Sequence, residues 1–180
     1  KIAKPIVQTL SSFLNRYRRN DKPEFTHTII PNHPIHYGGS YTIPDDKYNE
    51  FMDLYNKEVF EENKEAYLTE KHKEFSPILI DLDFRFSMDK SERQYGDEFI
   101  VNYLKWFMKE ARELLDIKGH IEIFVLEKTK PKIDSDKNIV KDGIHIMIPK
   151  LLTLPMIQYI LRYKMINNTE ISEMLSELGI

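Results

Sequence analysis

The sequence predicts an α/β (α+β) fold in which a sheet carries acidic side chains on one face and helices cover the other. Three observations support this prediction. Residues 78–84 form an apolar run of strand length that only two acidic residues interrupt. Residues 97–117 carry apolar side chains at helical spacing, and residues 143–148 alternate isoleucine with other residues as a strand does.

The composition allows a globular chain. It has 180 residues, of which 41% are hydrophobic, and this is enough to bury a core. No run approaches the roughly 18 continuous apolar residues of a membrane helix, and no secretory signal is recognisable. We therefore expect no membrane partner and no secretion. The absence of cysteine excludes disulfides and thiolate zinc sites.

The net charge of −3 gives no general attraction to a polyanion. Any contact with nucleic acid must then come from bound cations or from local basic clusters. Two such clusters are possible: Arg16, Arg18, Arg19 and Lys22 near the start of the chain, and Lys128, Lys130 and Lys132 later.

The first part of the chain, residues 1–75, is expected to be a mostly helical subdomain. Apolar residues recur at helical spacing in residues 6–17 and again in residues 48–59. Between them, residues 24–44 hold two brief extended runs separated by proline and glycine, which predicts a hairpin or loop.

The second part, residues 76–180, has a different pattern. It predicts, in order, a strand over residues 78–84, a helix over 97–117, strands over 121–126 and 143–148, and helices over 154–165 and 170–178. Gly179 directly follows the last helical pattern and is a typical helix end.

Two carboxylates stand side by side on the first of these strands. Because side chains alternate along a strand, Asp81 and Asp83 share one face and the apolar residues between them face the other layer. Closely placed carboxylates repel each other unless a cation neutralises them, and Mg²⁺ prefers such oxygen ligands. Arg85 shares this face, where it could brace a carboxylate or a triphosphate, although a surface arginine is an equally good interpretation.

A second polar row lies on the strand predicted over residues 143–148. Alternation places Lys141, Gly143 and His145 on one face. A cation, an approachable backbone and an imidazole can together bind phosphate oxygens. The alternative is a strand whose histidine is bonded to a neighbour.

Residues 76–86 (SPILIDLDFRF) and 141–149 (KDGIHIMIP), and more loosely residues 26–28 and 39–44, resemble the archaeo-eukaryotic primases. Within them, the chain is similar to the primase-helicases of large DNA viruses of the pox, asfar and giant-virus kind. The resemblance implies a primase-type, RRM-like palm sheet over residues 76–180. It also implies a DNA primase or primase-polymerase that synthesises primers by two-metal nucleotidyl transfer.

The resemblance also implies roles for individual residues. Asp81 and Asp83 are then the catalytic residues that bind two Mg²⁺ or Mn²⁺ ions, and His145 contacts the phosphates of the incoming nucleotide. Lys141 matches a lysine four residues before the histidine in related primase-polymerases. Gly143 stands where those proteins often have serine, which removes a hydroxyl donor.

The family has a third metal-binding acid, for which no good candidate follows His145. Glu122 is a fallback, but we expect the third acid beyond Ile180, so that this fragment alone is poorly active or inactive. The implied partners are a single-stranded DNA template, nucleoside triphosphates and a helicase region of the same polypeptide. The implied location is a viral replication factory in the host cytoplasm.

Two other functions remain open at this point. A metal-dependent DNA nuclease could place Asp81 or Asp83 with Glu122 and Lys128 around one ion. A non-catalytic domain could instead dock other replication proteins. DNA cleavage without nucleotide would favour the first, and a lack of nucleotide affinity would favour the second.

Overall fold

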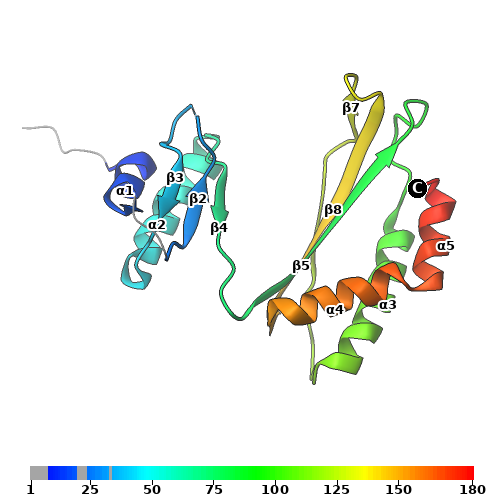
Figure 1. Ribbon diagram of the computed structural model, residues 1–180. Coiled ribbons are helices and arrows are strands. Elements are labelled where there is room, and N and C mark those ends of the chain that lie inside the picture. The colour runs from blue at the N-terminus through cyan, green and yellow to red at the C-terminus, as the bar shows by residue number, and fades with distance from the viewer. Residues whose placement is uncertain (1–7, 20–23, 33) are drawn as a thin grey trace, which may run out of the picture. The chain divides into compact units, whose positions relative to one another are not determined.

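A computed structural model describes residues 8–19, 24–32 and 34–180 of the chain (Figure 1). The chain divides into two compact units, Lys1–His72 and Lys73–Ile180. Each unit has its own hydrophobic core. The described residues form a mixed α+β fold with two antiparallel sheets, which confirms the predicted class.

The N-terminal unit contains a four-stranded sheet in addition to its helices. Its helices are α1 (Leu10–Arg16) and α2 (Tyr48–Tyr55), and its sheet has the order β1-β3-β2-β4, with β1 (Arg18–Arg19), β2 (His27–Ile29), β3 (Gly39–Tyr41) and β4 (Leu68–Glu70). A 3-10 turn, Asp45–Lys47, precedes α2, and a π-helical segment, Asn56–Glu61, follows it. The pair β2 and β3 confirms the predicted hairpin. No apolar alternation marks β4, which is short and largely exposed, and the sequence pattern therefore missed it.

The start of α1 differs from the prediction for a local reason. The side-chain oxygen of Thr9 accepts a hydrogen bond from the N–H of Ser12, so Thr9 caps the helix and Leu10 begins it. Part of the predicted segment, residues 6 and 7, lies outside the described residues.

The C-terminal unit follows the predicted order of elements. These are β5 (Ser76–Phe86), α3 (Asp97–Leu114), β6 (Phe124–Glu127), β7 (Lys132–Asp134), β8 (Ile139–Thr153), α4 (Pro155–Ile166) and α5 (Thr169–Leu178). The sheet has the order β5-β8-β6, and β7 also pairs with β8. The short β7 was not predicted. Strand β8 is much longer than the predicted strand because every residue of β5 has a partner on it, with a shift of register between Pro77 and Ile78.

The helices α3, α4 and α5 pack against one face of this sheet (Figure 1). That face carries the buried residues Ile78 and Phe84 of β5 and Ile144, Ile146 and Ile148 of β8. The predicted division of each strand into an apolar face and a polar face is therefore confirmed. The last helix ends at Gly179, whose φ of 78° is left-handed, as predicted.

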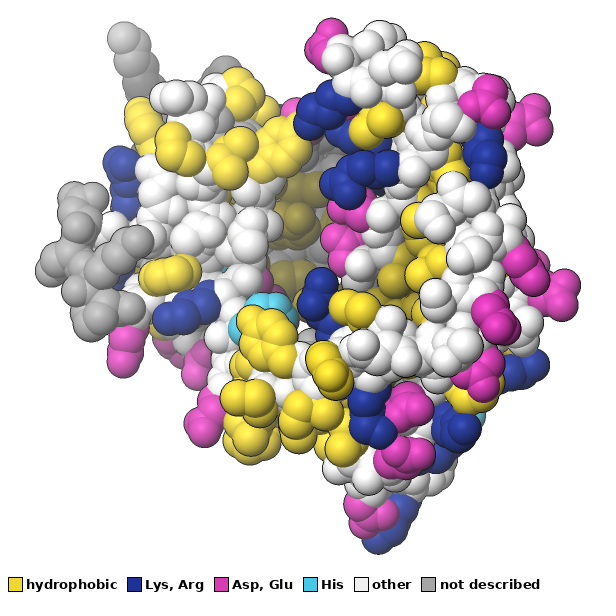
Figure 2. Space-filling view, turned by 45° about the vertical axis from the view of Figure 1, so that its right-hand side comes forward, with side chains coloured by type: hydrophobic (Ala, Val, Ile, Leu, Met, Phe, Trp, Pro, Cys, Tyr) yellow, Lys and Arg dark blue, Asp and Glu magenta, His cyan; other side chains and the backbone are white. Residues whose placement is uncertain are grey.

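Acidic and basic side chains are interspersed on the surface that Figure 2 shows. The basic residues of the first predicted cluster lie at the end of α1 and on β1, except Lys22, which falls outside the described residues. Among the helices that the structure describes, none has the length and apolar character needed to cross a lipid bilayer.

Candidate functional site

The two polar rows predicted from the sequence lie directly against each other. In the register of β5 and β8, each predicted residue faces a partner: Asp81 lies opposite His145, Asp83 opposite Gly143, and Arg85 opposite Lys141. Paired residues of an antiparallel sheet share one face, so all of these side chains project from the face that the helices leave open. We call it the acid face, and it carries residues 79, 81, 83 and 85 of β5 and 141, 143, 145 and 147 of β8.

Asp81 and His145 form a direct pair across the strands. Nε2 of His145 lies 3.2 Å from Oδ1 of Asp81, and the two side chains are 64% and 60% exposed. Both groups are therefore open to solvent and to a ligand. The contact holds the imidazole over the acid face, next to the carboxylates.

Gly143 occupies a position with no room for a side chain. A Cβ atom there would lie 2.7 Å from the backbone oxygen of Leu82, which is far closer than van der Waals contact, and 3.5 Å from Oδ1 of Asp83. Glycine at this position thus has a steric reason: β5 approaches β8 too closely here for a side chain.

This steric limit predicts the effect of Gly143→Ser. The added atoms must displace the backbone of β5 beside Asp83, and we expect the free energy of unfolding in urea to fall by about 1–3 kcal/mol. Gly96→Ser is the matched control, because a Cβ there meets nothing within 4 Å and serine suits the position before α3. Equal stability of the two variants would contradict the close approach.

A buried ionic network fixes the backbone of Gly143 from the helix side. Asp142 is completely buried, its Oδ1 accepts the N–H of Gly143 at 2.9 Å, and its Oδ2 accepts Nε of Arg93 at 3.0 Å. The hydroxyl of Tyr95 donates to the carbonyl oxygen of Gly143 at 3.3 Å. This part of β8 needs such partners, because β6 pairs only with residues 144–147 and β7 only with residues 139–141.

Arg93 connects three segments of the unit. Besides Asp142, it donates to Oε1 of Glu127 at 3.0 Å and to the backbone oxygen of Lys128. The hydrogen bond to Asp142 raises the pKa of Arg93. Burial, followed by the nearby charge of Asp142, raises the pKa of Tyr95. Sequence reasoning gave no role to this network, because Arg93 lies in a loop without a recognisable pattern.

A row of cations crosses the sheet beyond the acids. Arg85 lies opposite Lys141, and Lys132 of β7 lies opposite Lys141 from the other side. Lys141 is not free, since its Nζ lies 2.6 Å from Oδ2 of Asp134, and this contact lowers the pKa of Asp134. The sequence placed Lys132 only in a general basic cluster, and β7 brings it into this row.

Glu122, the fallback candidate for a third metal-binding acid, does not join Asp81 and Asp83. Oε2 of Glu122 lies 2.6 Å from Nζ of Lys150, and this ion pair lowers the pKa of Glu122. Strand β6 separates Glu122 from Lys128, so the structure does not gather the residues of the nuclease alternative. Within the described ranges, no group of three or more His, Asp or Glu residues could hold a metal ion.

Asp81 and Asp83 nevertheless have suitable chemistry for Mg²⁺ or Mn²⁺. Both carboxylates point the same way from an exposed face. Mg²⁺ typically takes one or two protein carboxylates and completes its shell with water and substrate phosphate oxygens. Two carboxylates therefore suit an ion that takes its other ligands from a nucleotide and water. They do not suit a closed metal site in which the protein supplies every ligand.

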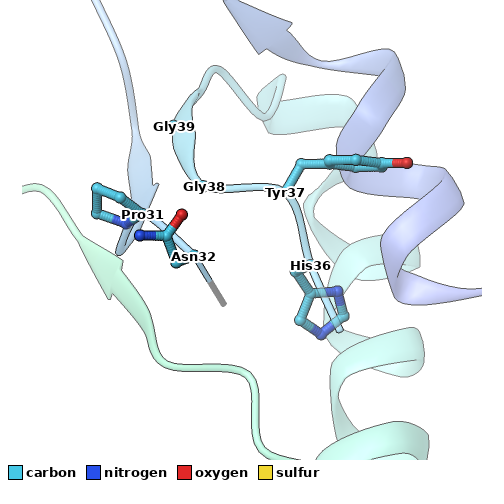
Figure 3. A pocket seen from close by; sticks show the side chains of 6 residues that line it. All are labelled: Pro31, Asn32, His36, Tyr37, Gly38 and Gly39. Carbon is cyan, nitrogen blue, oxygen red and sulfur yellow. The ribbon is translucent and has the colours of Figure 1, made fainter. Parts of the chain in front are cut away.

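The N-terminal unit holds a pocket, whereas Asp81, Asp83 and His145 belong to the C-terminal unit. The pocket has a volume of about 440 Å³ and is lined by Pro31, Asn32, His36, Tyr37, Gly38 and Gly39 (Figure 3). The ring of Tyr37 points away from Pro31 and Asn32, and none of the predicted site residues lines the pocket.

Comparison with known proteins gives a family match over most of the chain. The family model described as "C962R protein N-terminal AEP domain" matches residues 26–180. A protein of Acanthamoeba polyphaga mimivirus named "Putative helicase L207/L206" is 30% identical over an alignment of 164 residues, and the alignment covers 88% of this chain and 16% of that protein. A protein of Invertebrate iridescent virus 6 named "Putative helicase 184R" is 28% identical over an alignment of 128 residues, and the alignment covers 63% of this chain and 13% of that protein. The chain therefore spans only a small part of either relative.

Proposed function

Because the chain belongs to the family described as the C962R protein N-terminal AEP domain, we propose that it is the primase domain of a viral primase-helicase and synthesises primers by two-metal nucleotidyl transfer. The observation that carries this proposal is the direct pairing of the acid strand with the histidine strand on one exposed face. The proposal includes a primase-type, RRM-like palm over residues 76–180 and an N-terminal subdomain over residues 1–75.

In this proposal Asp81 and Asp83 hold two Mg²⁺ or Mn²⁺ ions together with the phosphates of the nucleotide. When bound, such ions activate the attacking hydroxyl and stabilise the departing pyrophosphate. The protein itself orients the two carboxylates on one rigid strand, β5, which β8 supports along its whole length. The third acid that the family resemblance implies is not assigned to a residue in this proposal.

The triphosphate is assigned to His145 and to the cationic row. His145 lies beside Asp81, and Arg85 and Lys141 lie one row beyond Asp83, about 7 Å further along the strands. Lys132 extends the row on β7. Phosphate oxygens that reach from the metal ions to this row would meet positive charge on three adjacent strands, which offsets their own negative charge.

The remaining partners are proposals for the longer protein. A helicase region in the same polypeptide is supported by the names and lengths of the two viral relatives. A single-stranded DNA template follows from primer synthesis, and the basic residues Lys128, Lys130 and Lys132 lie at the end of the sheet that holds the cationic row. We place the protein in the replication factory of a virus, in the host cytoplasm.

Replacing the histidine tests the nucleotide site. In His145→Ala we expect the affinity for a labelled nucleoside triphosphate with Mn²⁺ to fall about tenfold, because a hydrogen bond to a charged group contributes about 1.5–3 kcal/mol. Circular dichroism should show unchanged folding, since His145 is exposed. His120→Ala is the matched control, because His120 is an exposed histidine of the same unit.

This titration, together with a DNA-cleavage assay of the unaltered chain, separates the rival functions. Unchanged affinity in His145→Ala would contradict the proposed nucleotide site. Cleavage of DNA in the absence of any nucleotide would favour the nuclease. A folded protein that binds neither Mn²⁺ nor nucleotide would favour the docking domain.

A further inference from the structure

The acid face has an apolar end that the proposed chemistry does not use. Leu79 of β5 lies opposite Met147 of β8, and Phe124 of β6 lies opposite Met147 from the other side. Leu126 lies opposite His145. These four side chains are between 39% and 52% exposed, although all are large and hydrophobic. We call them the apolar end.

The charge of the side chains on the acid face therefore changes along the strands. The cationic row with Arg85 lies at one end, Asp83 and Asp81 follow in turn, and Leu79 lies at the other end. With about 3.3 Å per residue, the distance from Arg85 to Leu79 is about 20 Å and the carboxylates lie between them. Charge changes from positive through negative to neutral along this one line.

A nucleoside triphosphate changes in charge along its length in a way that matches this face. Its three phosphates form a polyanion at one end, and its base presents flat apolar faces at the other. Nucleotidyl transfer breaks the bond between the innermost phosphate and the two outer ones. A nucleotide with its innermost phosphate beside Asp81 and Asp83 would therefore extend its outer phosphates to one side and its nucleoside to the other. If the outer phosphates meet the cations, the nucleoside must extend toward Leu79 and Phe124.

We propose that the apolar end is the subsite for the base and sugar of the bound nucleoside triphosphate, with Phe124 and Met147 as its main contacts. The inference rests on the proposed function and adds the orientation of the nucleotide. Phe124 is 52% exposed beside Met147, so its ring is open to stack with a base. The flexible side chain of Met147 adapts to bases of different size, so the subsite accepts purines and pyrimidines.

Comparison of two ligands tests this subsite. Inorganic triphosphate has the same anionic groups as the nucleotide but no base or sugar. With Mn²⁺ present, calorimetric titration of Phe124→Ala should show about a tenfold loss of affinity for the nucleoside triphosphate, as expected for one lost stacking contact. The affinity for inorganic triphosphate should stay unchanged. Phe124→Leu, which keeps an apolar side chain without the ring, should show a smaller loss.

The control is Tyr159→Ala, because Tyr159 is an exposed aromatic residue of α4, on the helix side of the unit, with 68% exposure. It should change neither affinity. Two outcomes would overturn the subsite while the proposed function stands. One is an equal loss of affinity for nucleoside triphosphate and inorganic triphosphate in both Phe124→Ala and Phe124→Leu. The other is an unchanged affinity for the nucleoside triphosphate in Phe124→Ala. Failure of the wild-type chain to bind either ligand, or binding that survives Asp81→Asn with Asp83→Asn, would overturn the proposed function and the subsite with it.

Discussion

Replacing both acids of β5, Asp81→Asn together with Asp83→Asn, should abolish the Mn²⁺-dependent binding of nucleoside triphosphate. Asparagine keeps the size of each side chain but removes the charge that attracts the ion. We expect a loss of more than about 100-fold in affinity, because even changes outside the ligand shell of a metal cost about 10- to 100-fold. Titration of a labelled nucleotide with and without Mn²⁺ measures the effect.

The fold should survive this change, because both residues are exposed and neither contributes to the core. Thermal unfolding gives a second readout: Mn²⁺ with nucleotide should raise the melting temperature of the wild type and leave that of the variant unchanged. The matched control is Asp116→Asn with Asp136→Asn, two exposed acids of the same unit away from the acid face. Metal-dependent binding that persists in the Asp81 and Asp83 variant would place the metal site elsewhere.

Arg93→Ala should cause the largest loss of stability among the predicted variants. Its removal leaves the carboxylate of Asp142, which is completely buried, without its cationic partner. An unpaired buried charge is strongly unfavourable, and we expect the free energy of unfolding to fall by about 3 kcal/mol. Urea unfolding measures this change. Arg112→Ala, at an exposed arginine in the last turn of α3, should change little.

A second variant identifies the cause. Replacing both partners by apolar residues, Arg93→Met with Asp142→Leu, removes the buried charge as well as its partner and should recover much of the lost stability. The recovery should be incomplete, because the N–H of Gly143 also loses its acceptor. If the double variant were no more stable than Arg93→Ala, the packing of the arginine rather than the buried ion pair would be the source of the loss.

Sequence reasoning was most reliable where a structural property is local. The alternation of side chains in a strand placed Asp81 with Asp83 and Lys141 with His145 on polar faces before any contact was known, because this alternation belongs to the backbone of a single strand. The helical spacing that predicted α3 is local in the same way, and the structure places that helix at Asp97–Leu114.

Sequence reasoning failed where an element has no periodic signal of its own. The strands β4 and β7 have three residues each and little or no burial, so no hydrophobic pattern distinguishes them from loops. The sheet of the N-terminal unit was missed in part for this reason. These strands exist because neighbouring strands offer hydrogen-bonding partners, which is a property of the assembled sheet.

The sequence by itself determined which residues could form a site: two acids, a histidine and a lysine on two polar strand faces. Only the tertiary structure decided their register, which sets Asp81 against His145 and Asp83 against Gly143. It also decided that Asp134 pairs with Lys141. On the helix side of the sheet, Asp142 pairs with Arg93 and accepts the N–H of Gly143. Each of these contacts joins separate segments of the chain, and such contacts depend on how the whole sheet pairs and on what its other face buries.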